Sequence, residues 1–330
     1  MKKKIILLVL SLIFPISVYA YSDKIIPGGN TIGIKVNSKG VMIVGFYKVD
    51  GKYNKGTPEL KTGDYIIKIN NEDVESVDDL VKLVDKFKEN EEISITYLRN
   101  KKIQNTALEL IKIDGINKTG LYVKDSLTGI GTLSYIDPET GIYGALGHEI
   151  IESNSKQMID VKDGSIFKNI VVSIERSIDG NPGSKNAKFY NNEVYGNILK
   201  NTKYGIFGIP TQTLSQEAAI SVKKLSEVNL GKAYIRTVVN GTTKKDYEIN
   251  ITDINKNSKL KSITFEITDQ ELLNKTGGIV QGMSGSPIIQ DGYLVGAVTH
   301  VIVDDVEKGY GISIITMLDE GDKIINKIND

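Results

Sequence analysis

The sequence predicts a mainly β protein in which a smaller α+β unit precedes a larger antiparallel β unit. Three observations favour this fold class. The 330 residues give room for two domains of ordinary size. One amphipathic helix pattern lies among alternating apolar residues in the first third of the chain. From about residue 120 onward, short apolar segments alternate with glycine, which is typical of an antiparallel sandwich or barrel.

Residues 1–20 have the three-part plan of a secretory signal. Lysines at positions 2–4 precede an apolar run from 5 to 18, and Val-Tyr-Ala at 18–20 is a small-residue cleavage signature. A helix over this run would be about 20 Å long, which is short of the roughly 30 Å hydrocarbon core, so we expect cleavage and export. The alternative is an uncleaved anchor that associates the protein with the outer membrane face.

Composition narrows the classes of partner and cofactor. The chain carries 41 basic and 41 acidic residues and only three arginines, so we expect no nucleic-acid partner. The absence of cysteine excludes disulfides, thiolate metal ligands and a cysteine nucleophile. The two histidines and the scattered acids lack metal-ligand spacing, so we expect no metal and no other cofactor.

Residues 25–112 form the first unit and contain one predicted helix with strands around it. Ser76 is a good N-cap, and the helix that follows is expected to end near Asn90. Apolar residues recur at helical spacing after this cap: Val77, Leu80, Val81, Val84 and Phe87. Alternating apolar residues then predict a strand over 93–97. Together with Thr-Ile-Gly-Ile at 31–34 and the turn-and-strand pattern at 58–70, this order resembles a PDZ domain.

The PDZ resemblance implies a site for an extended peptide or a protein C-terminus, which such domains add as a strand beside the helix. Backbone N–H groups at Ile32, Gly33 and Ile34 would hold the terminal carboxylate. The alternative is that Gly33 only permits a turn. The apolar stripe of the helix is interpreted as core.

Residues 120–330 form the second unit, and residues 114–119 are the expected linker because they are rich in glycine, asparagine and lysine. Predicted strands include residues 130–136, 170–174 and 233–239, and no helix is expected before residues 315–327. A β-hairpin is predicted after residue 287, with its turn at Asp291 and Gly292.

A serine turn lies directly before this hairpin, in the run Gly-Met-Ser-Gly-Ser-Pro at 282–287. Glycines on both sides predict that Ser284 is displayed as a nucleophile. His148 is the expected general base, because the small residues before it leave room for its approach. His300 ends a predicted strand and is expected to line the substrate channel. The acid that orients the base is left open by spacing among Asp160, Asp163, Asp179, Asp246, Asp253 and Asp269.

The serine turn and its hairpin resemble those of chymotrypsin-like serine peptidases. More closely, the order of the PDZ unit, Gly-Ala-Leu-Gly-His at 144–148, Ile-Thr-Asp at 267–269 and the run 276–287 resembles the SpoIVB (stage IV sporulation protein B) peptidase family. This resemblance implies a catalytic triad of Ser284, His148 and Asp269. It also implies an oxyanion hole formed by the backbone N–H groups of Gly282 and Ser284.

Asp269 has an alternative role, because it also fits the N-cap of a short helical stretch that begins at residue 270. Asp253 and Asp179 are the substitutes for it as the orienting acid. Its separation from Ser284 is only 15 residues, whereas the acid of ordinary chymotrypsin-like enzymes lies far upstream.

The family resemblance implies an exported, self-cleaving serine endopeptidase that activates intramembrane processing of a late sigma-factor precursor. It would act on protein or peptide substrates, itself included, in the space between the forespore and mother-cell membranes, either secreted or anchored. The rival is a non-catalytic PDZ-containing peptide-binding protein on a protease-like scaffold. A lipase or esterase is disfavoured, because the serine turn lies among predicted strands and not at a strand-to-helix elbow.

Overall fold

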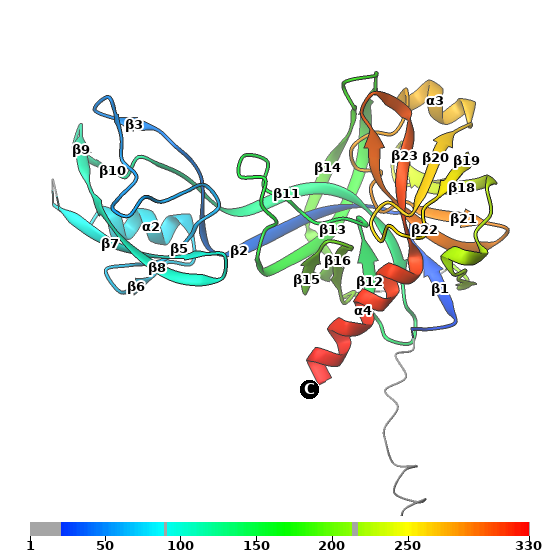
Figure 1. Cartoon of the computed structure of the whole chain (residues 1–330), viewed down its shortest axis with the longest axis horizontal. Coiled ribbons are helices and arrows are strands. Elements are labelled where there is room, and N and C mark those ends of the chain that lie inside the picture. Colours follow the sequence, from blue (N-terminus) through cyan, green and yellow to red (C-terminus); the bar gives the residue numbers. More distant parts are fainter. Residues whose placement is uncertain (1–20, 89–90, 213–216, 330) are drawn as a thin grey trace, which may run out of the picture.

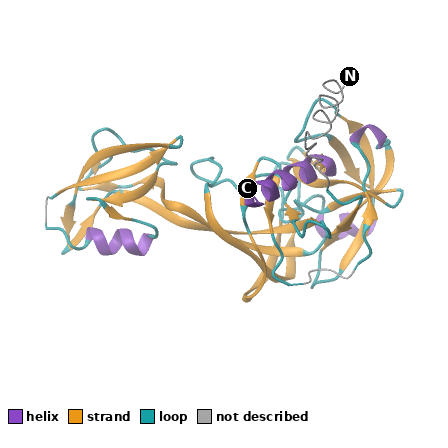
Figure 2. Ribbon diagram, turned by 90° about the horizontal axis from the view of Figure 1, so that it is seen from below, coloured by secondary structure: helices purple, strands orange, loops and turns teal. Residues whose placement is uncertain are grey.

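The computed structural model describes residues 21–88, 91–212 and 217–329 of the chain. These residues form two bodies that are joined by a pair of long strands (Figure 1), and Figure 2 shows the same arrangement from below. The predicted signal segment 1–20 lies outside the described residues. Within the described ranges, no helix is long and apolar enough to cross a bilayer.

The smaller body is an antiparallel sheet with one helix packed against it. Its strands follow the order β11-β2-β5-β7-β8, and their buried side chains share one core with those of the helix. The elements of this body before β11 are β2 (Thr31–Phe46), β3 (Lys48–Val49), β4 (Lys52–Tyr53), β5 (Tyr65–Ile69), β6 (Glu72–Asp73), α2 (Val77–Val84), β7 (Glu92–Arg99), β8 (Lys102–Glu109), β9 (Ile111–Ile113) and β10 (Ile116–Lys118). This body is the predicted α+β unit.

Helix α2 begins where it is predicted and ends earlier. Ser76 is its N-cap in a capping box, accepting from Asp79 N–H at 3.1 Å while the Asp79 carboxylate accepts from Ser76 N–H at 3.0 Å. After Val84 the chain turns more tightly, because Phe87 N–H bonds to the carbonyl three residues before it. The predicted end near Asn90 was therefore too late.

The predicted linker over residues 114–119 is part of a hairpin. Strands β9 and β10 pair across a turn at Asp114 and Gly115, which have φ of 52° and 78°. Asn117 in β10 then holds the end of α2, because its Nδ2 donates to Val84 O at 2.9 Å and to Phe87 O at 2.8 Å. The linker prediction was wrong, since these residues are tied to the smaller body.

The larger body combines an open sheet with a closed barrel. Its sheet contains β1 (Lys24–Pro27), β11 (Leu121–Ile136), β12 (Tyr143–Ala145), β13 (Val161–Glu175), β14 (Ser184–Asn197), β15 (Lys200–Thr202), β16 (Gly205–Gly208) and β17 (Ile220–Ser221). Its barrel closes in the order β18 (Gly231–Val238), β19 (Lys244–Ile254), β20 (Ile263–Ile267), β23 (Asp305–Ser313), β22 (Tyr293–Ile302) and β21 (Pro287–Gln290). The fold is therefore mainly β, as predicted.

Three short or terminal helices complete the larger body: η1 (Leu225–Glu227), α3 (Gln270–Thr276) and α4 (Ile314–Asn329). Helix α4 confirms the predicted C-terminal helix, and β21 and β22 confirm the hairpin after the serine turn. The turn residues of the β21–β22 hairpin, Asp291 and Gly292, both have positive φ, 53° and 80°, as a tight hairpin requires. The expectation of no helix before residue 315 was wrong, because α3 forms.

Strands β2 and β11 belong to both bodies. They pair antiparallel from Thr31 opposite Thr132 to Phe46 opposite Leu121, and Figure 1 shows them crossing between the bodies. The first half of β2 also pairs with β13, whereas its second half pairs with β5 through Val41. The smaller body is thus an insertion between two paired strands of the larger sheet.

Ile32, Gly33 and Ile34 do not form a carboxylate-binding loop. They lie in the first half of β2, between β11 and β13, and both isoleucine side chains are buried. A Cβ on Gly33 would collide with the ring of Phe167, so this glycine serves packing. The prediction was wrong because both edges of the strand are already paired. Strand β1 also pairs with the end of β11, so Ile26 and Pro27 lie in the larger sheet.

Candidate active site

The serine turn joins α3 to β21 and is anchored on β11. Gly282 and Gly285 both have φ of +94°, a conformation that L-residues with side chains rarely adopt. A Cβ on Gly285 would collide with the carbonyl oxygen of Thr132. Thr132 also donates its N–H to Ser284 O at 2.9 Å and its hydroxyl to Gly282 O at 2.7 Å. These contacts fix the turn against the strand.

The turn leaves two backbone donors beside the nucleophile. Met283 N–H bonds to Val280 O at 3.1 Å and Gly285 N–H to Val298 O at 2.7 Å. The N–H groups of Gly282 and Ser284 have no backbone acceptor within the described part of the chain. These two N–H groups were predicted to form the oxyanion hole, and their lack of a backbone acceptor fits that role.

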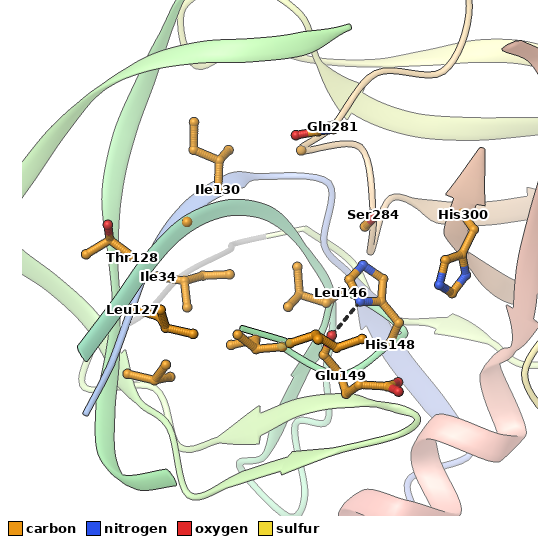
Figure 3. Close-up of a pocket in the computed structure, with 15 residues that line it drawn as sticks. Ile34, Leu127, Thr128, Ile130, Leu146, His148, Glu149, Gln281, Ser284 and His300 are labelled. Carbon is orange, nitrogen blue, oxygen red and sulfur yellow. Dashed lines mark hydrogen bonds between the residues drawn. The ribbon is translucent and has the colours of Figure 1, made fainter. Parts of the chain in front are cut away.

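His148 and His300 lie together beside Ser284, although 152 residues separate the two histidines in the sequence. Figure 3 shows both imidazoles and the serine at one side of the same cavity. The ring centroids of the histidines are 5.0 Å apart. The structure therefore brings the predicted nucleophile and the predicted base together, with His300 lining the cavity as expected.

The hydrogen bond of His148 identifies the ring nitrogen that is free to act. Its Nδ1 lies 2.8 Å from the backbone carbonyl oxygen of Glu149, drawn as the dashed line in Figure 3. A carbonyl oxygen only accepts, so Nδ1 must carry the proton and Nε2 must hold the lone pair. Burial lowers the pKa of His148, and the hydrogen bond and negative charge of Glu149 oppose that effect in part. The ring is neutral at pH 7.

Ser284 does not yet hydrogen-bond to that base. Its hydroxyl donates to Thr299 O at 2.8 Å, within strand β22. For Ser284 to give its proton to His148, the hydroxyl must leave this carbonyl by a rotation about χ1. The neighbouring His300 has a pKa lowered to about 4, because it is buried and lies near His148 and Lys261. The His300 ring is therefore also neutral at pH 7.

The hydrogen bonds of the Asp269 carboxylate go to backbone donors and not to His148. Asp269 is the N-cap of α3, where one carboxylate oxygen accepts from Leu272 N–H at 2.9 Å and the other from Glu248 N–H at 3.5 Å. It does not line the cavity that holds Ser284 and His148. These contacts support the alternative N-cap role, and the catalytic role of Asp269 stays a prediction of the family resemblance.

The two substitute acids are also engaged elsewhere. Asp179 accepts from Val306 N–H at 3.0 Å, and Asp253 is exposed on strand β19. Neither lines the cavity, whose only acidic residue is Glu149. The group that orients the imidazole is thus a backbone carbonyl, which no search among acidic side chains could find.

The cavity beside Ser284 has a volume of about 430 Å³, within the range of about 300–1,000 Å³ typical of ligand sites. Its wall away from the histidines is apolar and comes from β2, β11 and the segment after β12. The apolar residues are Ile34, Val36, Leu127, Ile130, Leu146, Ile150 and Ile151. In the described ranges, no three histidine, aspartate or glutamate side chains converge as a metal site.

A buried lysine supports the serine turn from behind and was not found by sequence reasoning. Lys185 is 2% exposed, donates to Thr237 Oγ1 at 2.9 Å and Thr31 Oγ1 at 3.3 Å, and packs against Gly282. No ion pair of the described residues includes it. Burial lowers the pKa of Lys185 to about 7. Its position in the alternating strand β14 carried no signal of this environment.

Comparisons with known proteins agree with two units. A family profile described as SpoIVB peptidase S55 matches residues 115–318, and a PDZ domain profile matches residues 31–110. The solved PDZ domain of the SdrC-like protein from Listeria monocytogenes is 22% identical over 27% of this chain and 90% of that chain, with a TM-score of 0.23. No curated protein matches the chain.

Two solved forms of the Rv3671c protease from M. tuberculosis are similar over more than half of the chain. The active form is 13% identical and covers 58% of this chain and 71% of that chain, with a TM-score of 0.33. The inactive form is 14% identical and covers 59% of this chain and 82% of that chain, also with a TM-score of 0.33.

The N-cap position of Asp269 predicts that its charge is dispensable for the reactivity of Ser284. Asp269→Asn keeps a good N-cap, so labelling of Ser284 by a fluorophosphonate should persist. Asp269→Ala should lower the free energy of unfolding by about 1 kcal/mol, as measured by urea denaturation. If a folded Asp269→Asn protein lost labelling by several orders of magnitude, the Asp269 carboxylate would be part of the catalytic machinery, contrary to this prediction.

The lowered pKa of His148 predicts the pH dependence of this reactivity. The base works only when it is neutral, so the labelling rate should rise with pH, have its midpoint below 6.5 and be flat at neutral pH. The measurement is the rate of fluorophosphonate labelling against pH. The midpoint should persist in His300→Asn and labelling should vanish in His148→Ala; a midpoint above 6.5 would contradict the assignment.

The buried Lys185 predicts a pH-dependent gain of stability on its replacement. Its folded-state pKa of about 7 is below the unfolded value of 10.5, so the unfolded chain binds the extra proton between these values. Lys185→Met should therefore raise the free energy of unfolding most at pH 7 and below, and the gain should shrink as pH rises toward 10.5. Urea denaturation checks this, with the exposed Lys188→Met on the same strand as control. A gain independent of pH would overturn it.

Proposed function

Since the chain belongs to the SpoIVB peptidase S55 family, whose profile covers residues 115–318, we propose that it is an endopeptidase with Ser284 as nucleophile and His148 as general base. The resemblance and the fold class predicted from the sequence, a PDZ domain followed by a β-barrel peptidase, are confirmed by these matches. The observation that carries the catalytic proposal is the meeting of Ser284, His148 and two free backbone donors in one cavity.

Acylation follows from these groups. His148 Nε2 takes the hydroxyl proton as Ser284 Oγ attacks the peptide carbonyl, and the developing oxyanion accepts hydrogen bonds from the N–H groups of Gly282 and Ser284. The imidazolium then gives the proton to the leaving amine, and the acyl-enzyme remains on Ser284. Water, deprotonated by the same ring, hydrolyses the ester and restores the serine.

The proposed base is oriented by the main chain. The carbonyl of Glu149 fixes the Nδ1–H tautomer and accepts its hydrogen bond at 2.8 Å, which is what the acid of a triad does for orientation. A neutral carbonyl stabilises the imidazolium less than a carboxylate does. We therefore expect a slow enzyme, which fits an enzyme that makes one or a few regulatory cuts.

The apolar cavity favours substrates with an apolar residue next to the scissile bond. Its wall is formed by aliphatic side chains, and burying one such substrate side chain contributes roughly 1.5–3 kcal/mol. A peptidase acts on protein chains, and a PDZ domain belongs to a class that binds peptides.

The biological setting is proposed from the family resemblance. The protein would be exported by residues 1–20, cleave itself, and act between the forespore and mother-cell membranes, secreted or anchored, to activate intramembrane processing of a late sigma-factor precursor. The three-part plan of residues 1–20 supports export.

The test is the substitution Ser284→Ala. It should lower peptide cleavage by several orders of magnitude, because the other hydroxyl of the turn, that of Ser286, is fully buried and does not line the cavity. Fluorophosphonate should label the wild type at Ser284 and leave the variant unlabelled. N-terminal sequencing of both proteins after export separates two events: signal removal persists in the variant and self-cleavage does not. An inert wild-type serine would favour the non-catalytic binding protein.

A further inference from the structure

One edge of strand β11 is open over residues 121–131, and we call this segment the open edge. The other edge of this segment is paired with β2, with a break in the register at Asp125. Within the part of the chain that the structure describes, no strand pairs with the open edge itself. An unpaired edge presents backbone N–H and C=O groups that bind another extended chain.

The open edge begins in the PDZ body, beside helix α2. Strand β11 is the end strand of the PDZ sheet, and Leu121 is buried in its core. Val77 N–H, at the start of α2, donates to Asp125 Oδ2 at 2.8 Å, so this end of the helix adjoins β11. Val81 lies one turn further on the same side of the helix and is 48% exposed. An apolar side chain on this side of α2 is therefore uncovered.

The open edge ends beside the serine turn that carries Ser284. Thr132, the residue after it, donates its N–H to Ser284 O at 2.9 Å, away from β2. Backbone groups alternate in direction along the regular register of residues 126–132 with β2. The residues that share the outward direction of Thr132 are Ser126, Thr128 and Ile130. Residues 127–130 also line the cavity beside Ser284.

We propose that the C-terminal segment of a protein substrate adds as a strand to the open edge of β11, with its terminal carboxylate in the PDZ body and its scissile bond at Ser284. The occupant is an extended peptide because the edge offers a row of backbone donors and acceptors. It is a substrate because the row is continuous with the proposed catalytic cavity. This inference rests on the proposed peptidase function.

The direction of the added strand follows from the sheet. Every strand pair in the sheet that contains β11 is antiparallel, and antiparallel pairing is the more stable kind. A strand antiparallel to β11 has its C-terminus at Leu121, where the turn of residues 118–120 precedes the strand. Lys118, three residues before Leu121 at the end of β10, is the basic residue that we assign to the carboxylate. In this proposal the turn of residues 118–120 has the carboxylate-binding role that was predicted for residues 32–34.

The length of the open edge sets the distance between the carboxylate and the cut. A strand paired with residues 121–130 has about ten residues and spans about 30 Å at ~3.3 Å per residue. The segment after β12 fixes the two ends relative to each other. Asp160 N–H donates to Tyr65 Oη at 3.1 Å, and the buried Glu152 is paired with Lys124 of β11 at 3.4 Å. The open edge therefore acts as a fixed spacer.

The experiment digests a library of long synthetic peptides of mixed sequence with the full-length protein and identifies every cut by mass spectrometry. Cuts should cluster about ten residues from the C-terminus. Amidation of the terminal carboxylate should reduce kcat/KM by about tenfold or more, since a charge-assisted contact is lost. Three residues inserted between the cut and the C-terminus should slow the original cut or move it to the bond at the original distance.

Two variants test the edge itself. Thr128→Pro removes one outward N–H and should abolish the clustering of cuts, whereas the matched Thr128→Val keeps that N–H and should preserve it. Circular dichroism shows whether the proline variant is folded. Cuts placed without regard to the C-terminus, and unchanged by amidation, would overturn the inference while leaving the peptidase intact. A wild type that fluorophosphonate does not label overturns the proposed function instead.

Discussion

The antiparallel ladder between β2 and β11 is the interaction on which the rest of the structure depends. It runs through both bodies, supplies two strands to each, and ends at Thr132, which holds the serine turn by its N–H and its hydroxyl. A shift of this ladder by one residue would move buried side chains to the other face and release the turn. The geometry of the nucleophile therefore depends on pairing that begins in the PDZ body.

Local patterns predicted the elements well, and long-range pairing explains what they missed. The capping residue Ser76 and the turn at Asp291 and Gly292 identify their elements because their chemistry is local. Ile32 and Gly33 could not be placed in the same way. Their sequence fits a PDZ loop, but β13, more than 120 residues later, pairs with that part of β2. That part of β2 therefore lies in the larger sheet.

The site residues divide in the same way, into those that local sequence predicts and those that depend on long-range contacts. Ser284, Gly282 and His148 could be predicted because reactive residues with small neighbours are visible in sequence. Asp269 was assigned from the family resemblance, yet its carboxylate satisfies the first turn of α3. The contact that orients His148 comes from a main-chain carbonyl, and every residue has one of these. Lys185 gave no signal either, since its burial arises from strands that meet only in the folded chain.

The insertion of the PDZ body between β2 and β11 also constrains the order of folding. The first strands leave the ribosome early, but β2 has no partner in the larger sheet until β11 and β13 have been made. Domain-by-domain folding from the N-terminus is therefore impossible for the larger body. Its serine turn comes later still, near the end of the chain. Catalytic competence is thus withheld until β11, β13 and the serine turn have all been made, so a shorter growing chain carries no assembled nucleophile.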